Sequence, residues 1–306
     1  MYYFLISDHG GGGRAVRLFP KIEKILKERG IQYTWWKSSS NHRAVEIVQE
    51  VCNSGDEDAR FIVMGGDGTV NAVLNGIPDF SKLKLGLIPT GSGNDFARGL
   101  GLSKNYKKAL AKILASKGDK TIDLGQVTKA DGSKRIFGIS CGFGMDAIIG
   151  RKADEASYKK FFNRLRMGKM IYVVAALDTL AHLKCTDARI RIDGGETRYL
   201  KKVFYLAFMN CRTEGGGIPM APNASNSDGK ISLGMGIGVK RWQGFIYFPL
   251  ILLGLQNKVK SFSEITCTSV EITSEEAQIC HYDGEALGEN STLKVEVLPK
   301  ILTVLV

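Results

Sequence analysis

Residues 61–77 constrain the fold most, because they join a strand, a glycine turn and a helix in the run FIVMGGDGTVNAVLNGI. The first four residues are apolar and predict a buried strand, and apolar residues recur at helical spacing after the turn. Gly65, Gly66 and Gly68 allow positive φ and a close approach of the backbone to a ligand. Such a turn gathers backbone N–H groups around an anion at a helix N-terminus, although an ordinary strand-to-helix turn with a capping Asp or Thr has the same short pattern.

Asp67 lies within this turn and does not suit a phosphate on its own. A carboxylate repels phosphate unless a divalent cation sits between the two groups. The combination of glycines and one acid therefore predicts a site for a metal and a nucleotide.

The surrounding sequence places this turn in a parallel sheet. Strands alternate with helices over the first 116 residues, which is typical of a sheet covered on both faces. The predicted strands are residues 2–6, 31–36, 61–64 and 83–89, and the loops that follow them are residues 7–13, 37–40, 65–69 and 90–95. Ligands bind at the carboxyl ends of such strands, so these loops are expected at one edge and strengthen the phosphate-site interpretation.

The pattern changes after a predicted helix at residues 106–116. From Lys120 onward, apolar and polar residues alternate with period two between glycines, which predicts an antiparallel β domain. Helical segments at residues 154–183 and 242–255 interrupt it, and two short strands around Pro299 are expected to close the chain.

Charge and composition narrow the partners. The 306 residues carry a formal net charge of +11, which favours a nucleotide, a nucleic acid or an acidic membrane surface. No stacking platform or nucleic-acid motif is present, so no nucleic-acid partner is expected.

Six cysteines without CxxC pairing indicate buried thiols in a reducing compartment. A secretory signal is absent and the apolar run at residues 245–255 is about half of a bilayer span, which predicts a cytoplasmic protein.

Further acids lie in similar glycine-rich settings. Asp95 belongs to a second glycine loop, PTGSGNDFAR, and Asp123 follows in TIDLG at the start of the β domain. Asp283 and Glu285 lie late in the chain, in HYDGEAL. Each alone could be a turn or cap residue, but their joint occurrence favours a catalytic role.

Taken together, these motifs resemble the diacylglycerol kinase catalytic-domain family, which includes bacterial soluble diacylglycerol kinases and sphingosine and ceramide kinases. GGDGTVN, PTGSGNDFAR, IDLG and YDGEAL stand in the order and spacing of that family. The segment 215–233 is similar to the family's P-x-A-x-x-x-DG stretch. GGDG alone is shared with NAD kinases and phosphofructokinases, whereas the combination is specific.

The resemblance implies a fold of two domains. The first, residues 1–122, would be a Rossmann-like (NAD kinase-like) α/β nucleotide-binding domain. The second, residues 123–297, would be a β-sandwich that carries the lipid substrate, and residues 298–306 would rejoin the first domain. The resemblance places the active site in the cleft between them.

The resemblance also implies a role for each matching residue. Asp67, Asp95 and Asp123 match an acidic trio that organises water and the catalytic Mg²⁺, and Asp283 and Glu285 match the motif that supplies the general base. Ser225, Asp228 and the carbonyl of Lys230 match a structural Mg²⁺ loop. One serine among residues 38–40, represented by Ser39, replaces a nucleotide-contacting Thr. The nucleotide-contacting set is Gly10, Gly11, Ser39, Gly65, Gly66, Asp67, Gly68, Thr69, Asn71, Gly91 and Ser92.

Three departures from the family pattern concern the nucleotide loops and the structural Mg²⁺ loop. Ala72 stands where the family commonly has Glu, and SDHGGGG replaces NPxSG in the first loop, so phosphate contacts there would come from backbone amides. Ser225 occupies a position that is acidic in some relatives.

The expected activity is ATP-dependent, Mg²⁺-assisted phosphorylation of a lipid hydroxyl in phospholipid metabolism, with diacylglycerol as the favoured acceptor. A sphingoid base, ceramide or phosphatidylglycerol remains an alternative acceptor, as does a non-catalytic lipid- or nucleotide-binding regulator of the same fold. An NAD or sugar kinase is a further rival.

The lipid would be reached at the inner membrane face through anionic headgroups, by the basic segment 158–170 or the apolar helix 242–255. A homodimer is compatible with this interpretation.

Overall fold

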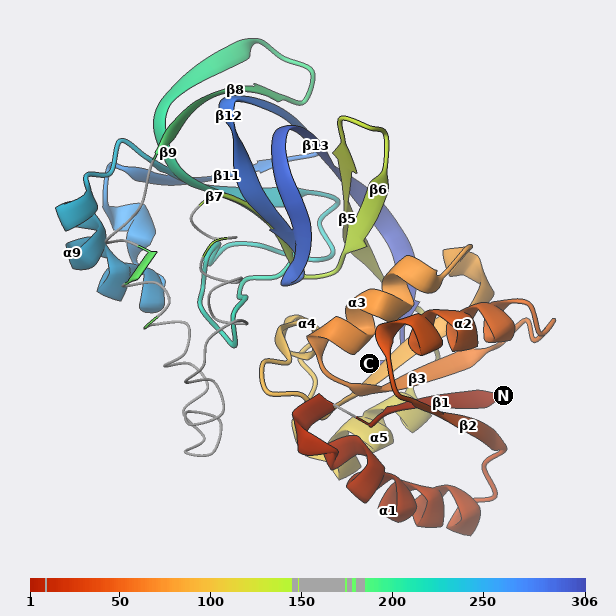
Figure 1. Ribbon diagram of the computed structural model, residues 1–306. Helices are drawn as coiled ribbons and strands as arrows, with labels where there is room; N and C mark the ends of the chain where they lie inside the picture. Colours follow the sequence, from red (N-terminus) through yellow and green to blue (C-terminus); the bar gives the residue numbers. More distant parts are fainter. Residues whose placement is uncertain (9, 145–147, 149–173, 175–177, 180–184) are drawn as a thin grey trace. The chain divides into compact units, whose positions relative to one another are not determined.

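The chain forms two compact units in the computed structural model. One unit comprises Met1–Leu124 and Pro299–Val306, and the other comprises Gly125–Leu298. The strands β5 (Lys120–Lys129) and β13 (Glu285–Val304) cross the boundary between them, so the second unit is inserted into the first. The structure describes residues 1–8, 10–144, 148, 174, 178–179 and 185–306 (Figure 1).

A parallel sheet forms the centre of the first unit. Its strands are β1 (Tyr2–Ser7), β2 (Tyr33–Ser38), β3 (Arg60–Gly65) and β4 (Lys84–Pro89). They pair in the order β4-β3-β1-β2, all parallel, and the end of β13 joins β4 through the pair Val304 and Leu85. The predicted parallel sheet is confirmed.

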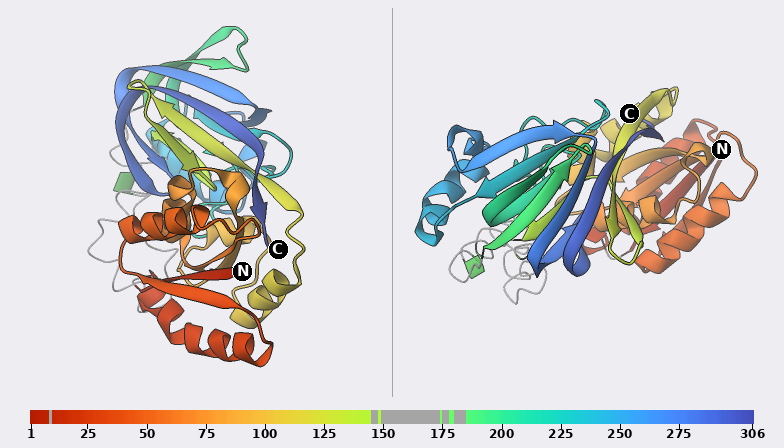
Figure 2. Two further views of the ribbon diagram at one scale, coloured as in Figure 1. Left: turned by 90° about the vertical axis from the view of Figure 1, so that its right-hand side faces the viewer. Right: turned by 90° about the horizontal axis from the view of Figure 1, so that it is seen from above.

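Helices cover both faces of this sheet, as Figures 1 and 2 show. The helices α1 (Arg14–Glu28) and α5 (Tyr106–Ala115) lie on one face, and α2 (Asn41–Cys52) and α3 (Asp67–Gly76) lie on the other. The short elements are η1 (Gly10–Gly12), η2 (Phe80–Lys82) and α4 (Asp95–Gly99). A helix with apolar residues three or four apart buries one stripe against a sheet, which is why these segments are helical here.

The core between the sheet and α1 shows this spacing directly. Phe19, Ile22 and Leu26 of α1 are buried and pack in one cluster with Phe4 and Ile62 of the sheet. Fully burying one such side chain contributes about 1.5–3 kcal/mol. The unit is therefore held by its apolar helix faces, and its polar loops at the strand ends are available for binding.

The second unit is built on antiparallel strands. These are β6 (Lys134–Phe137), β7 (Ser140–Gly144), β8 (Thr186–Ile192), β9 (Thr197–Met209), β10 (Ile231–Ile237), β11 (Phe262–Cys267) and β12 (Ser269–Tyr282), with parts of β5 and β13. The order is β11-β10-β9-β7-β12-β13, while β8 pairs with β9 and β12, and β6 pairs with β5. The predicted antiparallel domain is confirmed.

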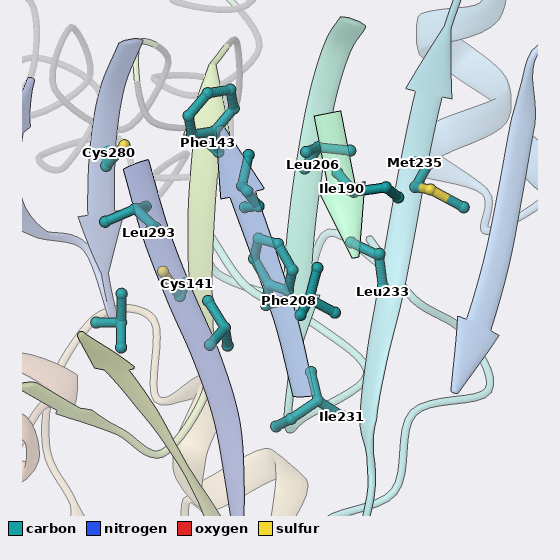
Figure 3. Close-up of a cluster of buried hydrophobic side chains, with 14 of the residues drawn as sticks. Cys141, Phe143, Ile190, Leu206, Phe208, Ile231, Leu233, Met235, Cys280 and Leu293 are labelled. Atoms are coloured by element: carbon teal, nitrogen blue, oxygen red, sulfur yellow. The ribbon is translucent and has the colours of Figure 1, made fainter. Parts of the chain in front are cut away.

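Two apolar clusters cover opposite faces of this sheet. Leu206 and Phe208 of β9 enter the cluster shown in Figure 3, together with Phe143 and Cys141 of β7. The alternate residues of β9, among them Tyr205, enter a second cluster beneath α9 (Arg241–Leu252). Successive side chains of a strand point to opposite faces, so the apolar run in β9 is buried on both sides.

The structure differs from the sequence-based expectation at the end of the chain. The two short strands expected around Pro299 are one continuous strand, β13. Its partner changes near the proline, because Glu296 pairs antiparallel with β12 whereas Val304 pairs parallel with β4. Proline cannot donate to a ladder, and here it lies where the strand exchanges one partner for another.

Two further expectations concern helices and thiols. Nearly all of the helical segment predicted at residues 154–183, including the basic segment 158–170, lies outside the described residues. The second helix is present as α9 and is followed by η3 (Gln256–Lys258). Five of the six cysteines are buried, as predicted, and Cys185 is partly exposed. Among the described residues, no helix is long and apolar enough to cross a membrane.

Candidate active site

The opening glycine turn forms the N-terminus of α3. The helix begins at Asp67, and its N-cap, Gly66, offers no side chain to the first-turn amides. A Cβ at Gly65 would lie only 2.7 Å from the Cβ of Thr69, so the strand and helix approach closely because position 65 has no side chain. The first-turn amides, which no side chain of the N-cap residue satisfies, and the positive end of the helix dipole together suit an anion.

Three loops of the first unit converge around this turn. A Cβ on Gly91 would lie 2.6 Å from the Cα of Gly66, so the loops after β3 and β4 touch backbone to backbone. A Cβ on Gly11 would overlap the carbonyl oxygen of Thr90, so the loop after β1 lies at the same place. We call Gly10, Gly11, Gly65, Gly66 and Gly91 the glycine cradle. The predicted convergence of loops at the carboxyl edge of the sheet holds for these three loops.

Side chains stiffen the loop after β4. Asn94 has φ 56°, in the left-handed region that Asn tolerates better than most residues. Its Oδ1 accepts a hydrogen bond from the Gly91 N–H at 3.0 Å, and its Nδ2 donates to the Gly91 carbonyl at 2.6 Å. Arg98 donates to the Gly93 carbonyl at 3.1 Å and forms an ion pair with Asp95. Both residues therefore position the cradle, a role that the motif spacing did not reveal.

Thr90 adds a polar group to the cradle. Its backbone N–H donates to the Gly65 carbonyl at 2.9 Å, which joins the two loops. The residue is 1% exposed, and no described residue hydrogen-bonds to its Oγ1. A buried hydroxyl without a partner costs about 1–3 kcal/mol, and a phosphate oxygen is a group that would satisfy it. The cradle fits a nucleotide phosphate on this observation.

Each of the three central aspartates has a protein partner. Asp67 accepts from the Phe96 N–H at 3.1 Å and so ties α3 to the start of α4. Asp123 is buried and accepts from the Lys300 N–H at 2.7 Å, which fastens the last residues of the chain to the first unit. Asp95 is buried beside Arg98.

The three aspartates do not form a closed metal cage. Among the described residues, no three His, Cys, Asp or Glu side chains are grouped so that they could hold a metal ion. Mg²⁺ in nucleotide sites usually keeps several waters and takes one or two carboxylates plus phosphate oxygens. The donor set at the cradle, with Asp67 in the first turn of α3, fits an ion held in that way.

The remaining residues that were predicted to contact the nucleotide differ in their exposure to solvent. Asn71 is buried and accepts, through its carbonyl, from Nδ2 of Asn75 at 3.0 Å. Ser92 is exposed, whereas Gly68 and Thr69 are partly buried in the first turn of α3. Ala72 lies on the buried side of that helix.

The serines at residues 38–40 can now be distinguished. Ser40 caps α2 by accepting from the Arg43 N–H at 3.1 Å. The Ser38 hydroxyl is buried and donates to the Ser40 carbonyl at 2.8 Å. Ser39 and Ser40 are both exposed, and the nucleotide contact of Ser39 stays a prediction.

In the second unit, Asp283 anchors a turn between β12 and β13. Its Oδ1 accepts from the N–H groups of Ile139 and Ser140 at 2.7 and 3.0 Å, and its Oδ2 accepts from the Gly138 N–H at 2.8 Å. The residue has φ 49°, and its own N–H donates to the Ser140 carbonyl at 2.8 Å. Glu285 follows as the first residue of β13 and is partly buried.

Glu214 was not foreseen as part of this region. The Ser140 hydroxyl donates to its Oε2 at 2.5 Å, and Asn210 donates from Nδ2 to the Gly138 carbonyl at 2.9 Å. Glu214 lies in CRTEGGG, which gives no signal beyond that of a turn. The pairing of β7 with β9, and the N–H groups of Asn210 and Cys211 that donate to the Ile139 carbonyl, bring the chain after β9 beside the segment that holds Asp283.

The residues of the predicted structural Mg²⁺ loop form hydrogen bonds with one another. The Lys230 N–H donates to Asp228 Oδ1 at 3.1 Å, and the Ser227 N–H donates to the Ser225 hydroxyl at 3.4 Å. Asp228 is exposed and is the single carboxylate among residues 225–230. One exposed carboxylate does not suit a buried, all-protein Mg²⁺ site, so the metal role of Ser225, Asp228 and Lys230 stays a prediction.

Comparison with known proteins agrees with this division into two parts. The family model of the diacylglycerol kinase catalytic domain matches residues 1–127, and that of the YegS C-terminal NAD kinase beta sandwich-like domain matches residues 139–306. The chain belongs to the diacylglycerol kinase catalytic-domain family. It is therefore a kinase, a phosphotransferase of the lipid-kinase family, as the motifs indicated.

Individual relatives support the assignment. The chain is 30% identical over 270 residues to a diacylglycerol kinase of Mycobacterium tuberculosis (strain ATCC 25618 / H37Rv), covering 88% of this chain and 83% of that protein. It is 30% identical over 218 residues to a diacylglycerol kinase of Bacillus subtilis (strain 168), covering 71% of this chain and 66% of that protein.

Solved structures show the same fold. A diacylglycerol kinase structure from Bacillus anthracis has a TM-score of 0.73 at 21% identity, covering 99% of this chain and 96% of that one. An NAD kinase from Archaeoglobus fulgidus, solved in complex with ATP, has a TM-score of 0.52 at 12% identity, covering 100% of this chain and 94% of that one. The predicted fold class, NAD kinase-like α/β followed by a β-sandwich, is confirmed.

Proposed function

We propose that this kinase transfers the γ-phosphoryl group of ATP to the hydroxyl of diacylglycerol and forms phosphatidic acid. Relatives that cover most of the chain are named diacylglycerol kinases. The observation that carries the proposal is the glycine cradle, where three loops meet and the buried Thr90 hydroxyl has no described partner. Phosphoryl transfer asks a protein mainly for positioning and charge stabilisation, and a backbone cradle provides both.

The cradle would bind the phosphates of ATP. The amides of the first turn of α3 and the hydroxyl of Thr90 would donate to phosphate oxygens, while Ser39, Ser92 and Thr69 supply further hydroxyls. Asp67 and Asp95 would hold Mg²⁺ largely through water, with Asp123 fixing the neighbouring backbone. When bound, the ion would offset charge on the phosphate oxygens.

Glu285 is our choice for the general base, with Asp283 as a positioning residue. Asp283 already accepts three backbone N–H bonds, which occupy most of its lone pairs. Glu285 would take the proton of the lipid hydroxyl as that oxygen forms its bond to the γ-phosphorus and ADP departs. Asp283 would hold the turn from which β13 and Glu285 start.

Phosphorylation of a lipid panel with labelled ATP tests the proposal. Diacylglycerol, a sphingoid base, ceramide and phosphatidylglycerol would be offered in detergent micelles, with NAD as a further acceptor. Preferred labelling of diacylglycerol supports the proposal. Preferred labelling of another lipid reassigns the acceptor, and labelling of NAD overturns the lipid activity. Tight ATP binding without transfer to any lipid would indicate a non-catalytic regulator. The Glu285→Gln protein serves as the inactive control.

A further inference from the structure

The helix α9 presents an apolar face to the solvent. We call the six residues of this face the apolar stripe: Trp242, Phe245, Ile246, Pro249, Leu252 and Leu253. All six are exposed, with Trp242 at 59%, Ile246 at 57% and Leu253 at 69%. Large apolar side chains gathered on one exposed face mark a surface that contacts another apolar phase.

The spacing of the stripe shows that it is one face of the helix. Five members lie within α9 and Leu253 is its C-cap residue, and their spacing of one, three or four residues places them along one side of the helix. The opposite side carries Phe248 and Ile251, which are buried and pack with Phe204 and Phe262. An ordinary surface helix is polar on the side away from its core, whereas α9 is apolar on both sides.

The charge of the residues around α9 indicates what kind of surface the apolar stripe contacts. Residues 229–263 contain five basic residues and no Asp or Glu: Lys230, Lys240, Arg241, Lys258 and Lys260. The lysines at 240, 258 and 260, which flank α9 and η3, are exposed. Apolar side chains bordered by cations match the interface of an anionic bilayer, where acyl chains lie beneath negative headgroups.

A second copy of the chain suits the apolar stripe less well than a membrane does. A symmetric dimer through the stripe would bring the lysines of both copies together, and Glu264, the next carboxylate along the chain, already accepts hydrogen bonds from Asn223 and Asn257. A lipid surface removes the stripe from water and neutralises the lysines at once.

We propose that the apolar stripe of α9 inserts into the interfacial layer of an anionic membrane, with Lys240, Lys258 and Lys260 on the headgroups. The inference rests on the proposed function, because the membrane would be the source of the lipid substrate. Tryptophan at the interface suits Trp242, whose ring has an apolar body and a polar N–H.

Vesicle binding tests the stripe directly. The full chain would be sedimented with vesicles of phosphatidylcholine alone or with added phosphatidylglycerol, at low and high salt. Wild type is expected to bind the anionic vesicles at low salt and to be released by salt. Ile246→Ser combined with Leu253→Ser should lower binding about tenfold or more, because two inserted side chains are lost. Val16→Ser, at an exposed apolar site of α1, is the matched control and should bind as wild type does.

Fluorescence adds a depth measurement. Lipids brominated on the acyl chains should quench Trp242, and the Trp242→Phe protein should lose that quenching, because the other two tryptophans lie in β2. Equal binding of the double variant and wild type, or quenching that survives Trp242→Phe, would overturn the inference. A dimer in solution that the double variant dissolves would instead assign the stripe to a second copy.

Activity separates this inference from the proposed function. On a short-chain diacylglycerol in detergent micelles, the double variant should turn over at the wild-type rate, while on vesicles it should be slower. Wild type that binds vesicles but phosphorylates no lipid would refute the proposed function and leave the stripe supported. Wild type that phosphorylates the micellar lipid but binds no anionic vesicle would refute the stripe alone.

Discussion

Two acidic residues two positions apart have different surroundings. Asp283 is held by the backbone N–H groups of residues 138–140, whereas Glu285 begins a strand. A carboxylate that organises a turn and a carboxylate that accepts a proton should respond differently to replacement by the amide. This contrast makes their roles separable.

Glu285→Gln is expected to lower kcat about 10²–10⁴-fold, because an amide cannot take the proton of the lipid hydroxyl. Its Tm should stay near that of wild type. Asp283→Asn should lower the Tm, because the amide nitrogen would face an N–H donor and leave it unpaired, at about 1–3 kcal/mol. Steady-state kinetics and thermal unfolding of both proteins measure the two effects. Near-normal turnover by folded Glu285→Gln protein would move the base role to Asp283.

Thr90→Val tests the cradle at the level of one hydroxyl. If Thr90 Oγ1 donates to a phosphate, the valine protein should show a higher KM for ATP, by about tenfold, with little change in kcat. Its Tm without nucleotide should not fall, since the buried hydroxyl has no described partner to lose. An unchanged KM together with a raised Tm would show that the hydroxyl is merely unsatisfied.

At the residue scale, the sequence predicts what depends on neighbours along the chain. A serine directly before a helical run is a cap signal that sequence alone can show, and Ser40 caps α2 in the structure. The roles of Thr90 and Asn94 depend on which loops meet at the sheet edge, and Glu214 depends on strand pairing across the second unit. Residue spacing carries no information on those contacts.

The glycine cradle is the element-scale feature that binding depends on most. Gly91→Ala would place a Cβ 2.6 Å from the Cα of Gly66, so one loop must move. ATP binding, measured by calorimetry, should weaken at least tenfold. Gly101→Ala is the control, because its φ is +66° and its Cβ would have open space. That protein should lose about 1 kcal/mol of stability and keep its ATP affinity.

Helices and strands whose apolar residues recur at a clear period were predictable from the sequence, and those without such a period were not. The strands β1, β3 and β4 and the helix α5 lie within a few residues of their expected bounds. The continuity of β13 was missed because proline usually ends a strand, and a change of partner cannot be read from residue types. The exposed face of α9 was ambiguous because a helix that is apolar on both sides has no preferred orientation in its sequence.

Across the whole molecule, the cysteines should be protected by the fold. Burial raises the pKa of the Cys267 and Cys280 thiols to about 12, and that of Cys52 is also raised by burial. Thiolate is the reactive form, so these thiols should resist iodoacetamide near neutral pH. Mass spectrometry should find native labelling mainly at the partly exposed Cys185, and labelling of all six cysteines after denaturation.

The raised pKa values of these thiols also determine how the stability of the fold changes with pH. A thiol whose pKa is higher in the folded state favours folding below its unfolded value of about 8.5, and this contribution is lost as pH rises towards 12. Stability should therefore fall through that alkaline window. Replacing Cys280 with Ala should reduce the slope, and an unchanged slope would refute the assignment.

The insertion of one unit into the other has a consequence for synthesis. Pro299–Val306 belongs to the first unit, and Leu302, Val304 and Leu305 are fully buried. Domains usually fold as they leave the ribosome, in order from the N-terminus. Here the first 124 residues emerge early but lack their last strand until residues 299–306 have been made, whereas residues 125–298 can complete their contacts sooner. The unit that begins first along this chain is therefore completed after the unit that is inserted into it.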